Sequence, residues 1–208
     1  MILDVHTHRP APGAIVNVDP VDPVTLDPQY LYSVGLHPWN SDRVTPEALA
    51  RLDGLAADPA VVAIGETGLD ALRGADIATQ QQLFDHHVEL SESLRRPLII
   101  HAVKTFPLII ASRRRHNPAM PWIIHGFRGK PQLAEELLRH GFYLSVGARV
   151  NPSSLAVIPP DRLLAETDDS PLSISAILSA IPVDSSVLSA NASRLFTVSD
   201  VNIDRDNK

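Results

Sequence analysis

Apolar residues in this chain gather in short runs that are bounded by turn-forming residues. Eight of these runs have the length and composition of β-strands. They are residues 2–5, 14–18, 31–35, 61–65, 97–101, 122–125, 142–147 and 163–166. Helical patterns lie between the later runs, at about 45–57, 76–95, 106–116 and 131–140. Alternation of strands and helices predicts parallel pairing with the helices outside.

The first fifty residues depart from this alternation. Only residues 9–13 separate the first two runs, which is too short for a helical crossover. The next link carries Pro20, Pro23 and Pro28, so it is not a regular helix. The chain has 208 residues, near the lower size limit of a full barrel. We therefore expect an α/β fold of the (β/α) TIM-barrel type, trimmed by one or two early helices.

The same pattern suggests one domain over residues 1–203 and a disordered tail over 204–208. No apolar stretch approaches the length that spans a bilayer, and the first strand begins too early for a signal peptide to precede it. We therefore expect a cytoplasmic protein that does not associate with membranes. The chain lacks cysteine, so any metal site would use nitrogen and oxygen ligands.

The net charge of −6 argues against a broad basic surface for duplex nucleic acid. It leaves phosphate substrates open, because bound metal ions would dominate the local field.

Residue types that bind divalent metals stand where the expected strands end. They are His6, His8, Glu66, His101, His125 and Asp168. For a single histidine after an apolar strand, a buried hydrogen-bonded side chain is the commoner explanation. Every strand of a barrel delivers its end to one shared mouth, so the set as a whole favours a site in which all six converge. That constellation predicts a metal-dependent hydrolase.

The positions suggest roles. His6 and His8 are two apart on a strand, so their side chains share one face. Asp4 lies deeper on that face, where it would either orient a ligand or form an ordinary strand-end hydrogen bond. The carboxylate of Glu66 could bridge two ions. Asp168 could bind metal through one oxygen and accept a proton from water through the other.

Several segments together resemble TatD-family metal-dependent hydrolases of a compact bacterial form, within the amidohydrolase-like barrels. They are Asp4-Val5-His6-Thr7-His8, Val34-Gly35-Leu36-His37-Pro38, Ala63-Ile64-Gly65-Glu66-Thr67-Gly68-Leu69-Asp70, Ile99-Ile100-His101, Ile124-His125-Gly126-Phe127 and Ala165-Glu166-Thr167-Asp168. They occur in family order up to about Pro171, and residues 191–196 resemble the closing helix of the family.

The resemblance implies a binuclear site with two divalent ions, Zn²⁺ or Mg²⁺, with Mn²⁺ as a third option. His6, His8 and Asp168 would hold one ion, His101 and His125 would hold the other, and Glu66 would bridge them. Family members are chiefly nucleases. The expected activity is therefore that of a phosphodiesterase or deoxyribonuclease acting on ester bonds, with DNA or a small phosphodiester as substrate and no obligate protein partner.

Substrate contacts are expected from His37, Lys104, Arg128 and Asp169. For His37, a strand-end hydrogen bond that locks the following loop is an equal alternative. Two aspartates follow one another here, so either Asp168 or Asp169 could be the metal ligand, although strand spacing favours Asp168. Two other functions remain: hydrolysis of an amide, ester or lactone bond, and metal binding without catalysis. The second is disfavoured because Glu66 and Asp168 are both present.

Overall fold

The computed structural model describes residues 1–196, and its centre is a sheet of eight strands that pair in chain order. The strands are β1 (Asp4–Thr7), β2 (Ala14–Val18), β3 (Leu31–Val34), β4 (Val61–Asp70), β5 (Leu98–Val103), β6 (Trp122–Ile124), β7 (Tyr143–Val146) and β8 (Leu163–Ala165). All seven pairings are parallel. A parallel bridge between Thr7 and Asp168 joins the first strand to the end of the last, which closes the barrel.

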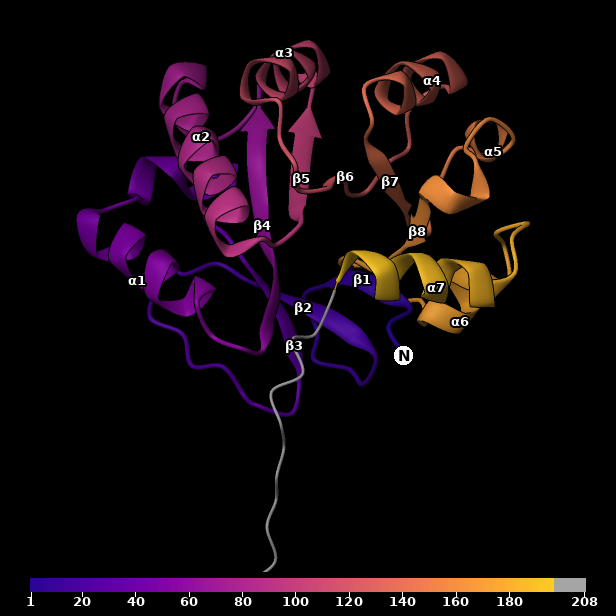
Figure 1. Ribbon diagram of the computed structural model, residues 1–208, viewed down its shortest axis with the longest axis horizontal. Helices are drawn as coiled ribbons and strands as arrows, with labels where there is room; N and C mark the ends of the chain where they lie inside the picture. The colour runs from indigo at the N-terminus through magenta and orange to yellow at the C-terminus, as the bar shows by residue number, and fades with distance from the viewer. Residues whose placement is uncertain (197–208) are drawn as a thin grey trace, which may run out of the picture.

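Helices lie outside the sheet, as Figure 1 shows for α2, α3 and α4. The helical elements are η1 (Pro38–Arg43), α1 (Pro46–Ala56), α2 (Ile77–Leu94), α3 (Phe106–His116), α4 (Pro131–Arg139), α5 (Pro152–Leu155), η2 (Pro160–Arg162), α6 (Ile174–Leu178) and α7 (Ser185–Leu195). Side chains cap the starts of two helices: Thr45 accepts a hydrogen bond from the backbone of α1, and Asp76 accepts one from that of α2. The expected helices α1 to α4 are confirmed.

The trimming of the barrel is also confirmed. Neither the link from β1 to β2 nor the link from β2 to β3 contains a helix. The segment 14–18 is nevertheless a parallel strand of the barrel, because it pairs with β1 on one side and β3 on the other. The short elements η1, α5, η2 and α6 were not expected, since one or two turns are too short to produce a periodic pattern.

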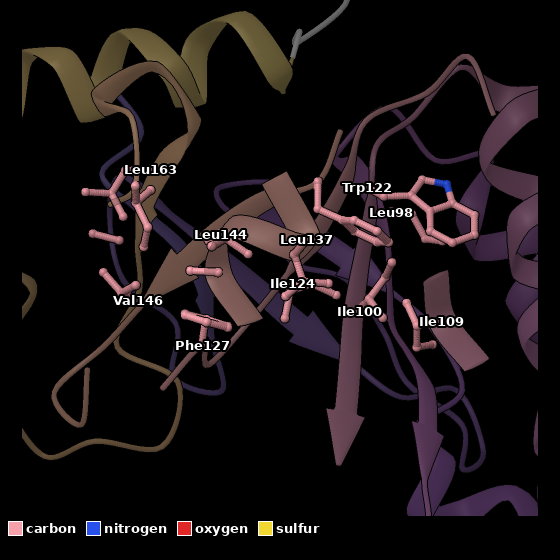
Figure 2. Close-up of a cluster of buried hydrophobic side chains, with 14 of the residues drawn as sticks. Leu98, Ile100, Ile109, Trp122, Ile124, Phe127, Leu137, Leu144, Val146 and Leu163 are labelled. Atoms are coloured by element: carbon pink, nitrogen blue, oxygen red, sulfur yellow. The ribbon is translucent and has the colours of Figure 1, made fainter. Parts of the chain in front are cut away.

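Side-chain alternation along the strands separates two layers of apolar residues. Leu98 and Ile100 of β5 belong to a large cluster that packs against Ile109 of α3 (Figure 2). Ile99 lies on the opposite face of the strand, in a second cluster. His101 follows Ile99 by two residues and therefore faces the interior of the barrel as well. His125 follows Ile123 of the second cluster by two residues, so the same argument turns its side chain toward the interior of the barrel.

Strand β4 corrects one feature of the expected layout. It does not end at Gly65 but continues to Asp70, and its register with β5 shifts between Ile64 and Thr67. Ile64 belongs to the large cluster that packs against the outer helices, so simple alternation would turn the side chain of Glu66 toward those helices. The irregularity turns it inward. Gly65 has a φ of 129°, and a Cβ there would collide with the carbonyl oxygen of Ile99.

The first and fifth strands also differ from their expected bounds. The first run is β1 at Asp4–Thr7 rather than residues 2–5, and β5 extends to Val103. Consequently His6, Glu66 and His101 lie within strands, not beyond their ends. The proposed tail 204–208 and the domain limit at residue 203 fall outside the described residues. Within residues 1–196, no helix combines the length and apolarity that a bilayer crossing requires.

Candidate metal centre

Glu66 stands at the centre of the residues that the sequence singled out. It is only 2% exposed, and its two carboxylate oxygens face different histidines. Oε2 lies 3.3 Å from Nε2 of His6 and 3.9 Å from Nε2 of His8. Oε1 lies 2.8 Å from Nε2 of His125 and 2.9 Å from Nδ1 of His101. Four side chains from three strands or strand ends therefore surround one carboxylate.

Asp168 joins the group on the Oε2 side. Its Oδ1 is 3.4 Å from Nε2 of His8 and 3.8 Å from Nε2 of His6. Its backbone N–H donates to the carbonyl of His6, and its own carbonyl accepts from the N–H of His8. Asp169 is exposed instead, and its Oδ1 accepts a hydrogen bond from Arg149. The structure thus brings Asp168 to the histidines and turns Asp169 away.

The donor atoms form a site that suits a divalent ion. His6, His8 and Asp168 make one group with mutually close ligand atoms, and His6, Glu66 and His125 make another. Both ring nitrogens of His6 are buried without a hydrogen-bond partner among residues 1–196. An unpartnered buried nitrogen is costly, and a metal bound at Nε2, which faces Glu66 and Asp168, would remove that cost for this nitrogen. Imidazole and carboxylate donors fit Zn²⁺, Mn²⁺ and related ions.

Electrostatics keep the central carboxylate ionised. Burial alone would raise the pKa of Glu66, but the surrounding His125, His101 and His37 hold that pKa well below its usual range. Burial likewise opposes the charged form of His125, yet the carboxylates of Glu66 and Glu166 raise its pKa well above the usual value. The pKa of His8 is raised, chiefly by its hydrogen bond to Asp168. An excess of negative charge therefore gathers around these imidazoles, as a cation site requires.

His37 contacts Glu66 rather than the open part of the site. Its Nδ1 accepts the backbone N–H of Trp39 at the start of η1, so the ring proton of the neutral imidazole is on Nε2. That Nε2 donates to Oε1 of Glu66 over 2.8 Å. The strand-end hydrogen bond considered for His37 is therefore present. Its contact with a substrate phosphate stays a prediction.

Two carboxylates that were not predicted as site residues support two of the histidines on the side away from Glu66. Oδ2 of Asp70 lies 3.1 Å from Nε2 of His101. Oε1 of Glu166 lies 3.4 Å from Nδ1 of His125 and accepts the N–H of Gly126. Each pair fixes which ring nitrogen faces Glu66. Both acids stand in the motif segments quoted above, but only the folded geometry pairs them with these histidines.

Asp4 acts on the backbone. Its Oδ1 accepts the N–H of Thr167 at 2.9 Å, and its Oδ2 accepts the hydroxyl of Thr167 at 2.6 Å. A longer bond from the N–H of His6 also reaches Oδ1. Burial raises the pKa of the Asp4 carboxyl. Asp4 therefore holds the segment that carries Asp168 and does not contact a ligand imidazole.

A cavity of about 570 Å³ opens over this centre. Its wall includes His101, His125 and Asp168 from the centre, and Trp39, Arg73, Lys104, Arg128, Arg149 and Asp169 around them. Within residues 1–196, neither Lys104 nor Arg128 pairs with a carboxylate. The two cations predicted to contact substrate thus stand at the entrance with their charges available.

Comparison with known proteins places this geometry in a family. The model of the family described as "TatD related DNase" matches residues 25–175. The chain belongs to that family. A TatD relative from Cronobacter turicensis, named a 3'-5' ssDNA/RNA exonuclease, is 34% identical over 146 residues, 65% of this chain and 56% of its own. The metal-dependent hydrolase YcfH of Escherichia coli is 34% identical over 147 residues, 66% of this chain and 55% of its own.

The matched region thus spans little more than half the length of these TatD relatives. Among solved structures, the TatD homologue YjjV of Escherichia coli superposes with a TM-score of 0.81 at 24% identity, covering 95% of this chain and 98% of that one. A TatD-family hydrolase from Entamoeba histolytica gives a TM-score of 0.69 at 18% identity, over 81% and 75% of the two chains. These likenesses confirm the barrel fold.

Proposed function

We propose that this protein is a metal-dependent phosphodiesterase of the deoxyribonuclease type, with two divalent ions at the barrel mouth. His6, His8 and Asp168 would hold one ion, His101 and His125 would hold the other, and Glu66 would contact both. The identity of the metal, Zn²⁺, Mg²⁺ or Mn²⁺, is left to measurement. The substrate would be DNA or a smaller phosphodiester.

One observation carries the proposal: the two oxygens of Glu66 face separate sets of imidazoles. A carboxylate held in this way is arranged for bridging. A single ion would engage only one of the two sets and would leave the imidazoles beside the other oxygen without a metal. The histidines on the Oε1 side and the His6, His8 and Asp168 group on the Oε2 side thus suit two ions with one shared ligand.

Divalent ions bound here would lower the pKa of water and stabilise negative charge on phosphoryl oxygens. The remaining work belongs to the chain. The side chain of Asp168 is about one-third exposed at the cavity, so one oxygen can face the ligand group while the other accepts a proton from water. Lys104 and Arg128 at the entrance would hold phosphate oxygens by charge-assisted hydrogen bonds. This positive rim favours a phosphodiester over a neutral amide or lactone.

The test is metal-reconstituted protein assayed against single-stranded DNA, a generic phosphodiester and a lactone, with metal content measured by mass spectrometry. We expect two ions per chain, hydrolysis of the phosphodiesters, and loss of turnover in EDTA that a divalent ion restores. Undiminished turnover after exhaustive chelation would exclude the mechanism. Turnover of the lactone alone would indicate a hydrolase of amide, ester or lactone bonds. Two bound ions without any turnover would indicate a metal-binding protein.

A further inference from the structure

Trp39 is an exposed aromatic residue on the wall of the cavity. The residue is 45% exposed, whereas the other exposed large apolar residues within 1–196 are aliphatic: Met1, Leu72, Leu108 and Leu172. The indole ring centroid is 5.8 Å from that of His101, so it stands directly beside the proposed metal centre. Exposed apolar residues scattered singly require no explanation, but this one borders the site.

The indole is held in a fixed orientation. Its Nε1–H donates to Oδ2 of Asp70 over 2.6 Å, the same oxygen that lies 3.1 Å from Nε2 of His101. The ring of His37 packs edge-on against it at 4.9 Å between centroids. The indole therefore borders the cavity with its rotation already restricted, which reduces the entropy lost when a ligand binds.

Arg73 adds a cation to this surface. Its guanidinium carbon lies 4.1 Å from the centroid of the Trp39 ring, within the range of a cation–π contact. The loop that carries Arg73 is fastened to η1 and α2: the N–H of Ala75 donates to Ser41, and Gln80 donates to the carbonyl of Arg73. Both Trp39 and Arg73 line the cavity. The pair is thus a built part of the site.

We propose that the Trp39–Arg73 pair is a stacking seat for an unpaired nucleobase of a single-stranded substrate. The inference rests on the proposed function, since it supplies the base subsite beside the phosphodiester-cleaving centre. Aromatic rings and guanidinium planes both stack on bases, and stacking accepts any base because each presents a π-face. A base within a duplex has both faces covered by its neighbours. The seat therefore selects single strands or frayed ends.

The chain offers a spectroscopic test that does not depend on turnover. It has two tryptophans, and Trp122 is fully buried, so a change of emission on binding reports Trp39. Metal-loaded protein would be titrated with a hydrolysis-resistant phosphorothioate oligothymidylate and with the same oligomer made abasic at every position. Binding is followed in parallel by fluorescence anisotropy of an end-labelled oligomer. We expect quenching by the thymidylate, and binding weaker by about 5- to 100-fold for the abasic oligomer.

Variants separate stacking from support of the metal centre. Trp39→Phe removes the emission change but keeps a ring, so it should retain most of the preference for the base-bearing oligomer. Trp39→Ala should lose it, and Arg73→Ala should reduce it. Loss of the hydrogen bond to Asp70 affects both oligomers alike and cancels in their ratio. Arg139→Ala, on the exposed face of α4, is the matched arginine control and should leave the ratio unchanged.

Equal binding of the two oligomers by the wild type would overturn the proposal, as would quenching that persists in Trp39→Phe. Hydrolysis of base-bearing and abasic phosphodiester strands at equal rates would contradict the base-stacking proposal and support the proposed phosphodiesterase. Base-dependent binding without any hydrolysis would support base stacking and contradict the phosphodiesterase. Failure of both oligomers to bind would exclude the seat together with a nucleic-acid substrate.

Discussion

Asp4 accepts both the backbone N–H and the hydroxyl of Thr167, a residue 163 positions away in the sequence. These two hydrogen bonds tie the first strand to the residue that precedes Asp168. Both partners are buried, so water cannot replace the lost acceptor.

Replacement of Asp4 by Ala should therefore destabilise the fold substantially. The backbone N–H of Thr167 would remain buried without its acceptor, whereas the hydroxyl can still donate to Oγ1 of Thr7 at 2.9 Å. We expect the free energy of unfolding to fall by about 1–3 kcal/mol. Urea denaturation at neutral pH measures this loss. Asp42→Ala at an exposed position is the control and should change stability by less than about 0.5 kcal/mol. Equal effects of the two substitutions would mean that Asp4 does not hold the closure.

The neighbouring acids Asp168 and Asp169 should differ sharply. Asp168→Asn removes the charge of a proposed metal ligand and the proposed proton acceptor, and it should reduce turnover by about 100-fold or more. Asp169→Asn affects only an exposed pair with Arg149 and should have a small effect. Steady-state rates on a phosphodiester, with far-ultraviolet circular dichroism as a check on folding, decide between them. If Asp169→Asn were the inactive variant, Asp169 and not Asp168 would be the functional acid.

Glu166→Gln and Asp70→Asn should weaken metal binding without removing a ligand. Each acid fixes the ring of one histidine, and such partners typically contribute about 10- to 100-fold in metal affinity. Competition with a chromogenic chelator measures the effect. The exposed Asp161→Asn is a control of the same chemistry. Unchanged affinity in both variants would show that His101 and His125 keep their orientation without these partners.

His87 on α2 predicts a dependence of stability on pH. It is fully buried, and its Nε2 accepts the N–H of Leu36 while Nδ1 donates to Leu83. Burial lowers the pKa of His87 to about 4, against an unfolded value near 6.5. The folded state then binds fewer protons than the unfolded state between these values. Stability is fully present above about pH 6.5 and is lost as the pH falls toward 4, by about 3 kcal/mol in total.

The difference between wild type and His87→Gln isolates this contribution from the other histidines. The variant should be less stable at pH 7, because its side chain fills the site less well, but it should lose less stability between pH 6.5 and 4.5. Denaturant midpoints over this range supply both curves. Parallel curves for the two proteins would show that His87 does not account for the loss.

The barrel could be predicted because its strands are apolar runs between clear turn and cap signals. The start of α1 at Thr45 and the shared position of the six donor residues follow from local pattern plus barrel geometry. The pairing of residues 14–18 did not follow, because the links on either side of them contain no helical crossover. The inward orientation of Glu66 could not, since it depends on a register shift that alternation does not reveal. Asp70 and Glu166 acquire their partners only in the folded chain. The Trp39–Arg73 pair likewise joins η1 to the loop that follows β4.

The bridge between Thr7 and Asp168 that closes the barrel has a consequence for how the centre comes into being. His6 and His8 lie on one side of that bridge and Asp168 on the other, so the proposed group of these three residues forms only after the first and last strands have met. A chain still being synthesised, with its eighth strand inside the ribosome, would therefore lack this group. Metal ions would bind the closed barrel in preference to any opened form. Their binding would therefore stabilise the contact between the first strand and the segment that carries Asp168.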